Sequence, residues 1–200
     1  MSFEKPQNID EKRGRPLDLS RNKVILETTI NLVSENGYDS LTLDAVAKKA
    51  KVGKGTIYRR WSTKKELVIE AAIQMSPFET SKESLNKNQD LRGQIVDLLS
   101  LLFMEENKNY QKAMTAICNA VAWDEQSDIR EAFNLSYSKE MISIIEPYTQ
   151  KNSLPDEDIA LITDIGPALI MYNMQRKKWI NSSSYVEHLV DRLIMPLITN

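Results

Sequence analysis

Residues 51–65, KVGKGTIYRRWSTKK, gather the side chains with the clearest chemistry in this 200-residue chain. Lysine and arginine neutralise phosphate, and threonine and tyrosine hydroxyls bind phosphate oxygens or the edges of bases. The glycines on either side of Lys54 suit a tight turn and let the backbone approach a surface closely. This stretch therefore has the composition of a surface that binds a nucleic acid.

The positive charge of the chain is concentrated in this region. The whole chain has a net charge of −2, which by itself would not predict a nucleic-acid partner. Residues 44–65, however, hold eight lysines and arginines against Asp44 alone, a net charge of +7 that leaves −9 for the rest of the chain. A local basic patch of this kind is the electrostatic signature of binding to DNA or RNA.

Residue types that catalysis or metal binding would need are scarce. His188 is the only histidine and Cys118 the only cysteine, so an ordinary zinc site cannot form. No glycine-rich phosphate loop, nucleophile elbow or spaced pair of carboxylates appears. We expect no catalytic residue, metal site or cofactor. We expect Cys118 to be a buried, reduced thiol, and His188 to be solvated or at the edge of an interface rather than a pH switch.

Apolar residues recur at helical spacing along the chain, and strand-type alternation is absent. Ser20, Thr42 and Thr63 are suitable N-caps for three helices, and Glu66 completes a capping box with Thr63. Gly37 can end the first helix in a left-handed conformation. Before Thr63, TIYRRW predicts a helix too short to be stable alone, so its apolar side chains must pack on neighbouring helices.

The rest of the chain is also predicted to be helical, so the fold class is all-α. Residues 76–90 are expected to form a polar loop, and Pro147, Pro155 and NSSS to separate later helices. Pro167 should kink the helix that contains it or leave a carbonyl unpaired. The later helices are expected over residues 91–106, 109–123, 128–146, 156–178 and 184–198.

A helix, a glycine-containing turn and a second short helix form the helix-turn-helix unit, whose second helix enters the major groove of DNA. Here Val46, Ala47, Ile57 and Trp61 are apolar at positions that must face inward. The opposite face of the second helix holds Lys54, Thr56, Tyr58, Arg59 and Arg60.

Residues 21–67 resemble the DNA-binding domain of TetR/AcrR-type bacterial transcriptional regulators. The motifs that carry the resemblance are, in order, the IL and LV pairs of the first helix, GY at 37–38, TLDAVAKKA, VGKGTIYRRW and KKEL. The C-terminal part matches only in its all-helical layout and in its ending, YVEHLVDRLIMPLI. Lys51 is a departure, because such proteins usually have glycine there, and a left-handed lysine costs about 1 kcal/mol.

The resemblance implies an N-terminal three-helix helix-turn-helix head and a C-terminal helical bundle for ligand binding and dimerisation. The expected domains are a flexible basic arm over 1–19, a DNA-binding domain over 20–66 and a ligand-binding and dimerisation domain over 67–200. Arg13 and Arg15 of the arm either enter a narrow minor groove or form a solvated basic tail. The other expected DNA contacts are Thr42, Lys54, Gly55, Thr56, Tyr58, Arg59 and Lys64.

Methionine and aromatic residues in the C-terminal part either line a ligand pocket or simply fill the core. The resemblance favours a pocket somewhere among them. The candidate pocket residues are Phe103, Met104, Met114, Trp123, Tyr137, Met141, Met171 and Asn173.

The last two helices are the candidate dimer interface. Residues 165–174 are nearly all apolar, a stripe too broad for a helix that is covered on one side only. Two such helices per protomer would form a four-helix bundle across a two-fold axis, although an internal core is the alternative. The candidate interface residues are Ile165, Leu169, Tyr172, Tyr185, Leu189, Leu193 and Leu197.

The sequence thus indicates a sequence-specific DNA-binding transcriptional regulator. Its expected partners are double-stranded operator DNA, an unidentified small-molecule effector and a second copy of the chain. We expect a repressor that the effector releases from a palindromic operator. A transcriptional activator and a DNA-independent helical interaction protein are the alternatives. No apolar run is long enough for a membrane span and no signal peptide is evident, so a cytoplasmic location without a membrane partner is expected.

Overall fold

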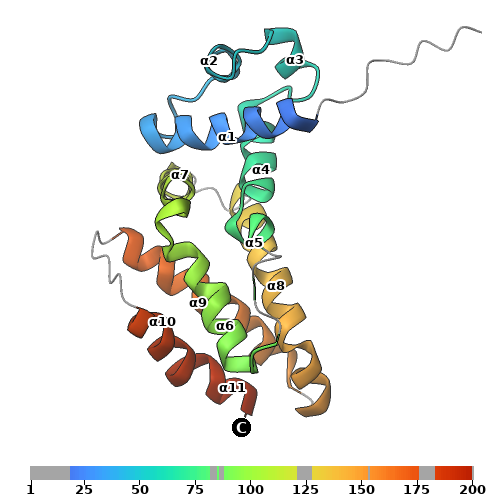
Figure 1. Cartoon of the computed structure of the whole chain (residues 1–200), viewed down its shortest axis with the longest axis vertical. Coiled ribbons are helices and arrows are strands. Elements are labelled where there is room, and N and C mark those ends of the chain that lie inside the picture. Colours follow the sequence, from blue (N-terminus) through green and yellow to red (C-terminus); the bar gives the residue numbers. More distant parts are fainter. Residues whose placement is uncertain are drawn as a thin grey trace, which may run out of the picture.

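The computed structural model describes residues 19–81, 85, 88–120, 128–152, 154–175 and 183–199. These residues form helices and turns and no strand, which confirms the all-α class. The molecule is elongated: α1, α2 and α3 form one end, which we call the head, and α4 leads from it toward the helices of the other end (Figure 1). The bounds of these helices are α1 (Leu19–Asn36), α2 (Leu43–Lys49), α3 (Lys54–Tyr58) and α4 (Lys64–Gln74).

The C-terminal part begins with the short helix α5 and ends with a helix interrupted by a π-helical turn. We call α6 and α8 to α11 the bundle. α7 lies between the bundle and the head (Figure 1). The bounds are α5 (Pro77–Thr80), α6 (Leu91–Ser100), α7 (Lys108–Ala120), α8 (Asp128–Asn152), α9 (Asp156–Gln175), α10 (Ser183–Leu189), the π turn (Val190–Ile194) and α11 (Met195–Thr199).

The predicted N-caps at Thr42 of α2 and Thr63 of α4 are confirmed. The Thr42 hydroxyl accepts a hydrogen bond from the Ala45 N–H at 3.1 Å, and the Thr63 hydroxyl accepts one from the Glu66 N–H at 3.2 Å. The Glu66 carboxylate accepts from the N–H of Ser62, the residue before the cap, at 2.8 Å. α2 and α4 therefore begin with backbone N–H groups that have side-chain partners.

Two left-handed residues shape the head. Gly37 follows α1 with φ +82°, as predicted. Lys51, between α2 and α3, has φ +55°, so the lysine does occupy a left-handed position that favours glycine. The predicted backbone strain at Lys51 is therefore present in the structure.

Several predicted helix boundaries were wrong. α1 already begins at Leu19, so Ser20 lies inside the helix rather than at its N-cap. Residues 76–90 contain α5, whose start the Ser76 hydroxyl caps by accepting from the Phe78 N–H at 3.3 Å. The helix predicted over 91–106 ends at Ser100, and two short 3-10 turns follow it.

Pro147 does not separate two helices. α8 continues through it to Asn152. Proline removes one backbone N–H and crowds one carbonyl, but packing on both sides can hold a helix together across it. Pro147 itself is exposed, whereas Met141 and Ile145 before it are buried in the bundle. Pro167 lies inside α9, as predicted.

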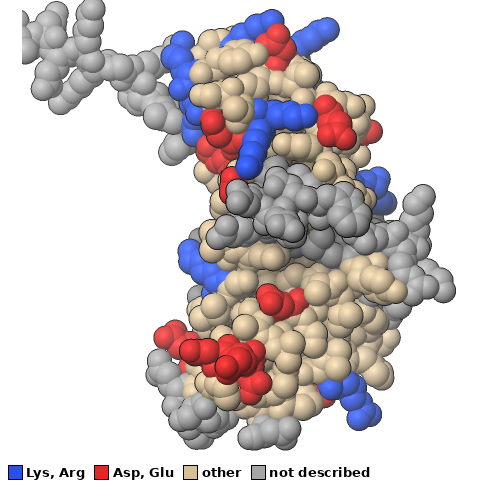
Figure 2. Space-filling view, turned by 180° about the vertical axis from the view of Figure 1, so that it is seen from behind, with Lys and Arg blue, Asp and Glu red and all other residues tan. Residues whose placement is uncertain are grey.

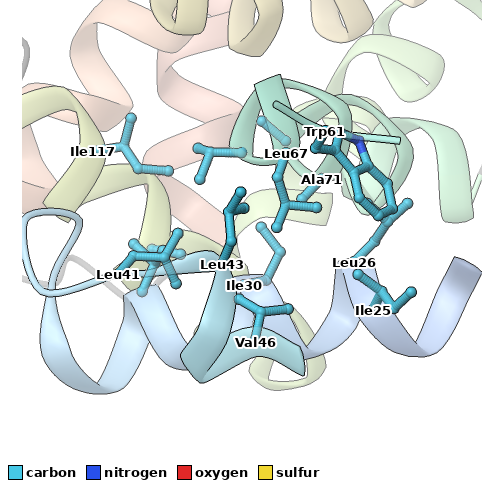
Figure 3. Close-up of a cluster of buried hydrophobic side chains, with 14 of the residues drawn as sticks. Ile25, Leu26, Ile30, Leu41, Leu43, Val46, Trp61, Leu67, Ala71 and Ile117 are labelled. Atoms are coloured by element: carbon cyan, nitrogen blue, oxygen red, sulfur yellow. The ribbon is translucent and has the colours of Figure 1, made fainter. Parts of the chain in front are cut away.

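The head shares one hydrophobic cluster with α4 and α7. Figure 3 shows Ile25, Leu26 and Trp61 from the head facing Leu67 of α4, with Ile117 of α7 in the same cluster. This cluster extends past residue 66, at which the sequence places the domain boundary. The boundary itself stays a prediction, but the head rests directly on α4 and α7.

A second hydrophobic cluster fills the bundle. Tyr137 of α8 lies near its centre, with its ring centroid 5.3 Å from that of Phe78 in an edge-on arrangement. A Cβ atom added at Gly166 of α9 would lie 2.6 Å from the Tyr137 hydroxyl oxygen and 2.7 Å from Leu99 Cδ2. Glycine therefore permits the close approach of α8 and α9 at this point.

Candidate nucleic-acid interface

α3 buries one face and exposes the other. Ile57 is fully buried and Trp61, which follows the helix, is 2% exposed, so both pack into the head cluster as the sequence predicts. Lys54, Tyr58 and Arg59 are exposed on the outside of the head. Such a division fixes the helix from behind and leaves its polar face available to a groove of DNA.

Glu70 of α4 anchors the end of α3. Its carboxylate accepts hydrogen bonds from Trp61 Nε1 at 2.7 Å and from Arg60 Nη2 at 3.1 Å. The Arg60 guanidinium also lies 4.6 Å from the centroid of the Trp61 ring, within range of a cation–π contact. Arg60 is therefore engaged with the protein. Nothing in the local sequence spacing indicated this role of Glu70.

Asp44 of α2 joins the exposed side chains of α3. Its carboxylate lies 2.5 Å from Lys54 Nζ through one oxygen and accepts a hydrogen bond from the Tyr58 hydroxyl at 3.2 Å through the other. The hydrogen bond from Lys54, and secondarily that from Tyr58, lowers the pKa of Asp44, and the pKa of Lys54 is raised in return. The sequence analysis missed this role, although Asp44 is the one acid in the basic segment.

Lys64 at the start of α4 reaches back to the loop between α1 and α2. Its ammonium donates to the carbonyl oxygens of Tyr38 and Asp39, both at 3.2 Å, and lies 4.5 Å from the centroid of the Tyr38 ring. The ammonium has three donors, so one remains for another acceptor. Lys64 thus fixes the loop and carries a positive charge beside it.

The predicted DNA contacts fall at neighbouring positions in the head. Thr42 caps the start of α2, Lys54 of α3 pairs with Asp44 of α2, and Thr56 is half-buried on α3. Figure 2 shows many blue Lys and Arg side chains on the end of the molecule that the head forms, with red acidic side chains among them. Arg13 and Arg15 lie outside the described residues.

Comparisons with known proteins agree with this geometry. The family model described as bacterial regulatory proteins, tetR family, matches residues 25–71. HTH-type transcriptional regulator Mb1581 of Mycobacterium bovis is 27% identical over 198 residues, which cover 96% of each chain. The DNA-binding transcriptional repressor TetR of Mycobacteroides abscessus is 24% identical over 185 residues, 90% of this chain and 94% of that one.

A solved structure extends the likeness to the bundle. The transcriptional regulator FadR from Bacillus subtilis, in complex with stearoyl-CoA, matches with a TM-score of 0.63 at 17% identity, covering 88% of this chain and 97% of that one. Residues 25–71 are thus a TetR-family DNA-binding domain, and the chain is similar to TetR-family regulators over most of its length. It is a DNA-binding transcriptional regulator and not an enzyme.

The candidate pocket residues lie at different places in the fold. Tyr137 and Met141 are fully buried in the bundle cluster, whereas Met114 belongs to the cluster beneath the head. Met104 is 41% exposed. Trp123 and the side chains of Phe103, Met171 and Asn173 lie outside the described residues.

The candidate dimer residues are also divided. Tyr172 is 53% and Leu193 41% exposed, but Leu189 is 5% exposed and packs inside the bundle of its own protomer. Ile165, Leu169, Tyr185 and Leu197 are half-buried against the same cluster. Only part of the predicted stripe is therefore open to a second copy.

Other expectations concern groups outside the interface. Cys118 is buried and forms no disulfide, as predicted, and His188 is exposed with Nδ1 2.9 Å from the Ser184 carbonyl oxygen. Within the described ranges, no group of three His, Cys, Asp or Glu side chains could hold a metal ion. In the same ranges no helix is long and apolar enough to cross a membrane.

Proposed function

We propose that this TetR-family regulator represses its target genes by binding a two-fold symmetric operator as a homodimer, and that a small molecule releases it. The observation that carries the DNA-binding part is the division of α3: Ile57 and Trp61 are buried, and Lys54, Tyr58 and Arg59 are exposed on one surface. In a dimer, two such helices would enter major grooves about 34–36 Å apart, or a multiple of that.

Gly55 supports a close approach of α3 to DNA. A Cβ atom added there would meet only Arg59 Nη1, at 3.5 Å, which is an ordinary contact. No neighbour within the described head therefore requires glycine at this position. A backbone that must come close to a phosphate would require it, since any side chain would hold the two apart.

The remaining DNA contacts follow from their places in the head. We place Thr42 at the start of α2 and Thr56 and Arg59 beside Tyr58 against the DNA backbone and bases, and the unused donor of Lys64 is available to a phosphate oxygen. We place Arg13 and Arg15 of the arm in the adjacent minor groove, whose negative potential attracts arginine.

Dimerisation through α9 and the last helices fits the exposed apolar surface. Leu161 is 48% and Tyr172 53% exposed on α9, and Leu193 is 41% exposed in the π turn. Large apolar side chains that share a surface mark an interaction site. We propose that Ile165, Leu169, Tyr185 and Leu197 form the partly buried rim of the same interface, while Leu189 supports it from inside.

The bundle is the proposed site of effector binding, with Tyr137 and Met141 at its centre. The Tyr137 hydroxyl is buried and has no hydrogen-bond partner among the described residues, so a polar group of a ligand could satisfy it. The similar FadR structure contains stearoyl-CoA, which shows that a protein of this fold can hold a ligand. An effector that stabilises an orientation of the heads unsuited to DNA weakens the binding of DNA. By linkage, DNA weakens the binding of the effector by the same factor.

Selection of duplexes from a random pool, followed by fluorescence-anisotropy titration across a salt series, tests the proposal. If each protomer neutralises about four phosphates, the slope of log K against log[salt] should be near −7, and Lys64→Ala should make it shallower by about 2. Lys139→Ala, on an exposed position of α8, is the matched control and should leave the slope unchanged. A folded protein that enriches no duplex would refute DNA binding and favour the interaction-protein alternative.

A further inference from the structure

Asp44 is placed to determine what the exposed face of α3 can bind. It is the second residue of α2, and its two carboxylate oxygens engage Lys54 and Tyr58, which lie one turn apart on α3. The engaged groups remain accessible, because the side chains of Lys54 and Asp44 are 67% and 47% exposed and Tyr58 is 51% exposed. Any molecule that docks on this face therefore meets all three groups together.

The hydrogen bond from Tyr58 to Asp44 restricts the hydroxyl to one role. A phenol has a single proton to donate, and here the carboxylate accepts it. The oxygen then has only lone pairs to offer. Phosphate oxygens are acceptors and cannot bind such a group, whereas the amino groups of adenine and cytosine in the major groove are donors and can.

The ion pair with Lys54 acts in the same direction. Lys54 Nζ lies 2.5 Å from the carboxylate, so its positive charge is largely neutralised before DNA arrives. The carboxylate also repels a nearby phosphate. Non-specific binding depends almost entirely on phosphate neutralisation, while sequence is recognised at base edges. An acid at this position therefore weakens non-specific binding more than specific binding.

We propose that Asp44 is a specificity-determining residue: it orients the Tyr58 hydroxyl to accept from a base amino group and reduces the attraction of Lys54 for phosphate. This inference rests on the proposed function, since it requires α3 to enter the major groove. It extends that function by predicting a base with an exocyclic amino group, adenine or cytosine, opposite Tyr58 in each half-site.

Asp44→Ala tests the proposal, with duplex selection and anisotropy titrations performed on the full chain. Loss of both acceptors frees the Tyr58 hydroxyl and the Lys54 charge for phosphate. We expect binding to a scrambled duplex to tighten about fivefold, the ratio of specific to non-specific affinity to fall by at least as much, and the salt slope to steepen by about 2 per dimer. The selected site should lose its preference for adenine or cytosine at one position per half-site.

Two further variants separate the contributions. Tyr58→Phe should lose the preference at the same position without a steeper salt slope, because Lys54 stays paired. Glu35→Ala is the matched control: it removes the same charge and breaks an ion pair of the same 2.5 Å length, with Lys49, and leaves Lys54 and Tyr58 in place. Glu35→Ala should keep the base preference. Thermal melting followed by circular dichroism verifies that each variant is folded.

The outcomes distinguish this proposal from the function on which it rests. If the wild-type chain enriches no duplex, the proposed function and the role of Asp44 fall together. If the wild type selects a site that Lys64→Ala weakens, but Asp44→Ala leaves the affinity ratio and the base preference unchanged, only the role of Asp44 is overturned. Equal weakening on both duplexes would also overturn it, since Asp44 would then merely support α3.

Discussion

The head and the bundle differ in the kind of group that is in an unfavourable state: a backbone conformation in the head, and side-chain hydroxyls in the bundle. In the head the cost lies in the backbone, where Lys51 holds φ +55° in the turn between α2 and α3. In the bundle it lies in side chains, because the hydroxyls of Tyr137 and Ser136 are buried and without hydrogen-bond partners among the described residues. Asn22 of the head is an intermediate case, since its amide oxygen has no partner within the described ranges while its Nδ2 donates to Glu70 at 3.5 Å.

This difference matches what each region has to do. A turn that positions α3 against DNA must keep one shape, and a strained residue can persist there because the neighbouring helices determine its conformation. Unpaired buried hydroxyls do not fix a shape, but they gain a partner when a polar ligand enters. Under the proposed function, the head is built for a fixed geometry and the bundle for a change of occupant.

The largest expected effect comes from adding a methyl group at Gly166, where α8 and α9 approach each other closely. Gly166→Ala places a methyl group 2.6 Å from the Tyr137 hydroxyl oxygen and 2.7 Å from Leu99, so overpacking should destabilise the chain by about 2–3 kcal/mol. Urea denaturation measures this loss. Combination with Tyr137→Phe should recover part of it, because the phenol oxygen is one of the two clashing atoms. Gly55→Ala meets only an ordinary contact at 3.5 Å and should cause no such loss.

The two hydrophobic clusters each bury a tyrosine, and the two hydroxyls differ in hydrogen bonding. The Tyr110 hydroxyl of α7 donates to the Ala72 carbonyl at 2.7 Å, whereas that of Tyr137 has no partner in the described part of the chain. Tyr110→Phe should therefore destabilise the chain by about 1 kcal/mol, and Tyr137→Phe should leave it unchanged or stabilise it by up to about 1 kcal/mol. Urea midpoints that fall equally in both variants would show that the two hydroxyls are equally satisfied.

The strain at Lys51 predicts a gain of similar size. Lys51→Gly removes the Cβ that disfavours φ +55° and should raise the free energy of unfolding by up to about 1 kcal/mol. The greater conformational entropy of glycine in the unfolded chain reduces this gain. Lys51→Ala keeps a Cβ and is the matched control for the lost charge and side chain. If both variants gain equally, the effect comes from charge, and the head carries no backbone strain at this turn.

The features that could be predicted from the sequence are those that depend on residues close together in the chain. The caps at Thr42 and Thr63 depend on residues three positions away, and Gly37 ends its helix alone, so the head could be derived from short motifs. The contact of Tyr137 with Gly166 joins residues far apart in the sequence. No periodicity encodes which side of α9 meets α8.

The candidate sites show the same limit. The exposed face of α3 followed from its amphipathic pattern, but its pairing with Asp44 depends on how two helices cross. The predicted stripe of the last helix is divided between two sides, because the π turn at residues 190–194 inserts an extra residue and Leu189 is buried while Leu193 is exposed. An even helical repeat cannot anticipate such a shift.

The smallest expected effect concerns the ion pair that ties α6 to the last helix. Arg92 donates to both carboxylate oxygens of Asp191, at 2.5 and 2.9 Å, and this pairing lowers the pKa of Asp191 below its usual value. A carboxylate whose pKa is lower in the folded state stabilises the fold above its unfolded pKa, and this contribution disappears as the pH falls through the folded value. Wild type should therefore melt slightly above Asp191→Asn at pH 7, with the two melting curves converging below about pH 4.

Other charged groups near Asp191 and Arg92 contribute to the same electrostatic interaction. His188 and Arg192 also lower the pKa of Asp191, and Glu187 lies 3.6 Å from Arg92 as a second acceptor. High salt should reduce the difference at pH 7, since all these groups are exposed. A melting difference that survives both acid and salt would mean that Asp191 contributes through packing of the π turn rather than through its charge.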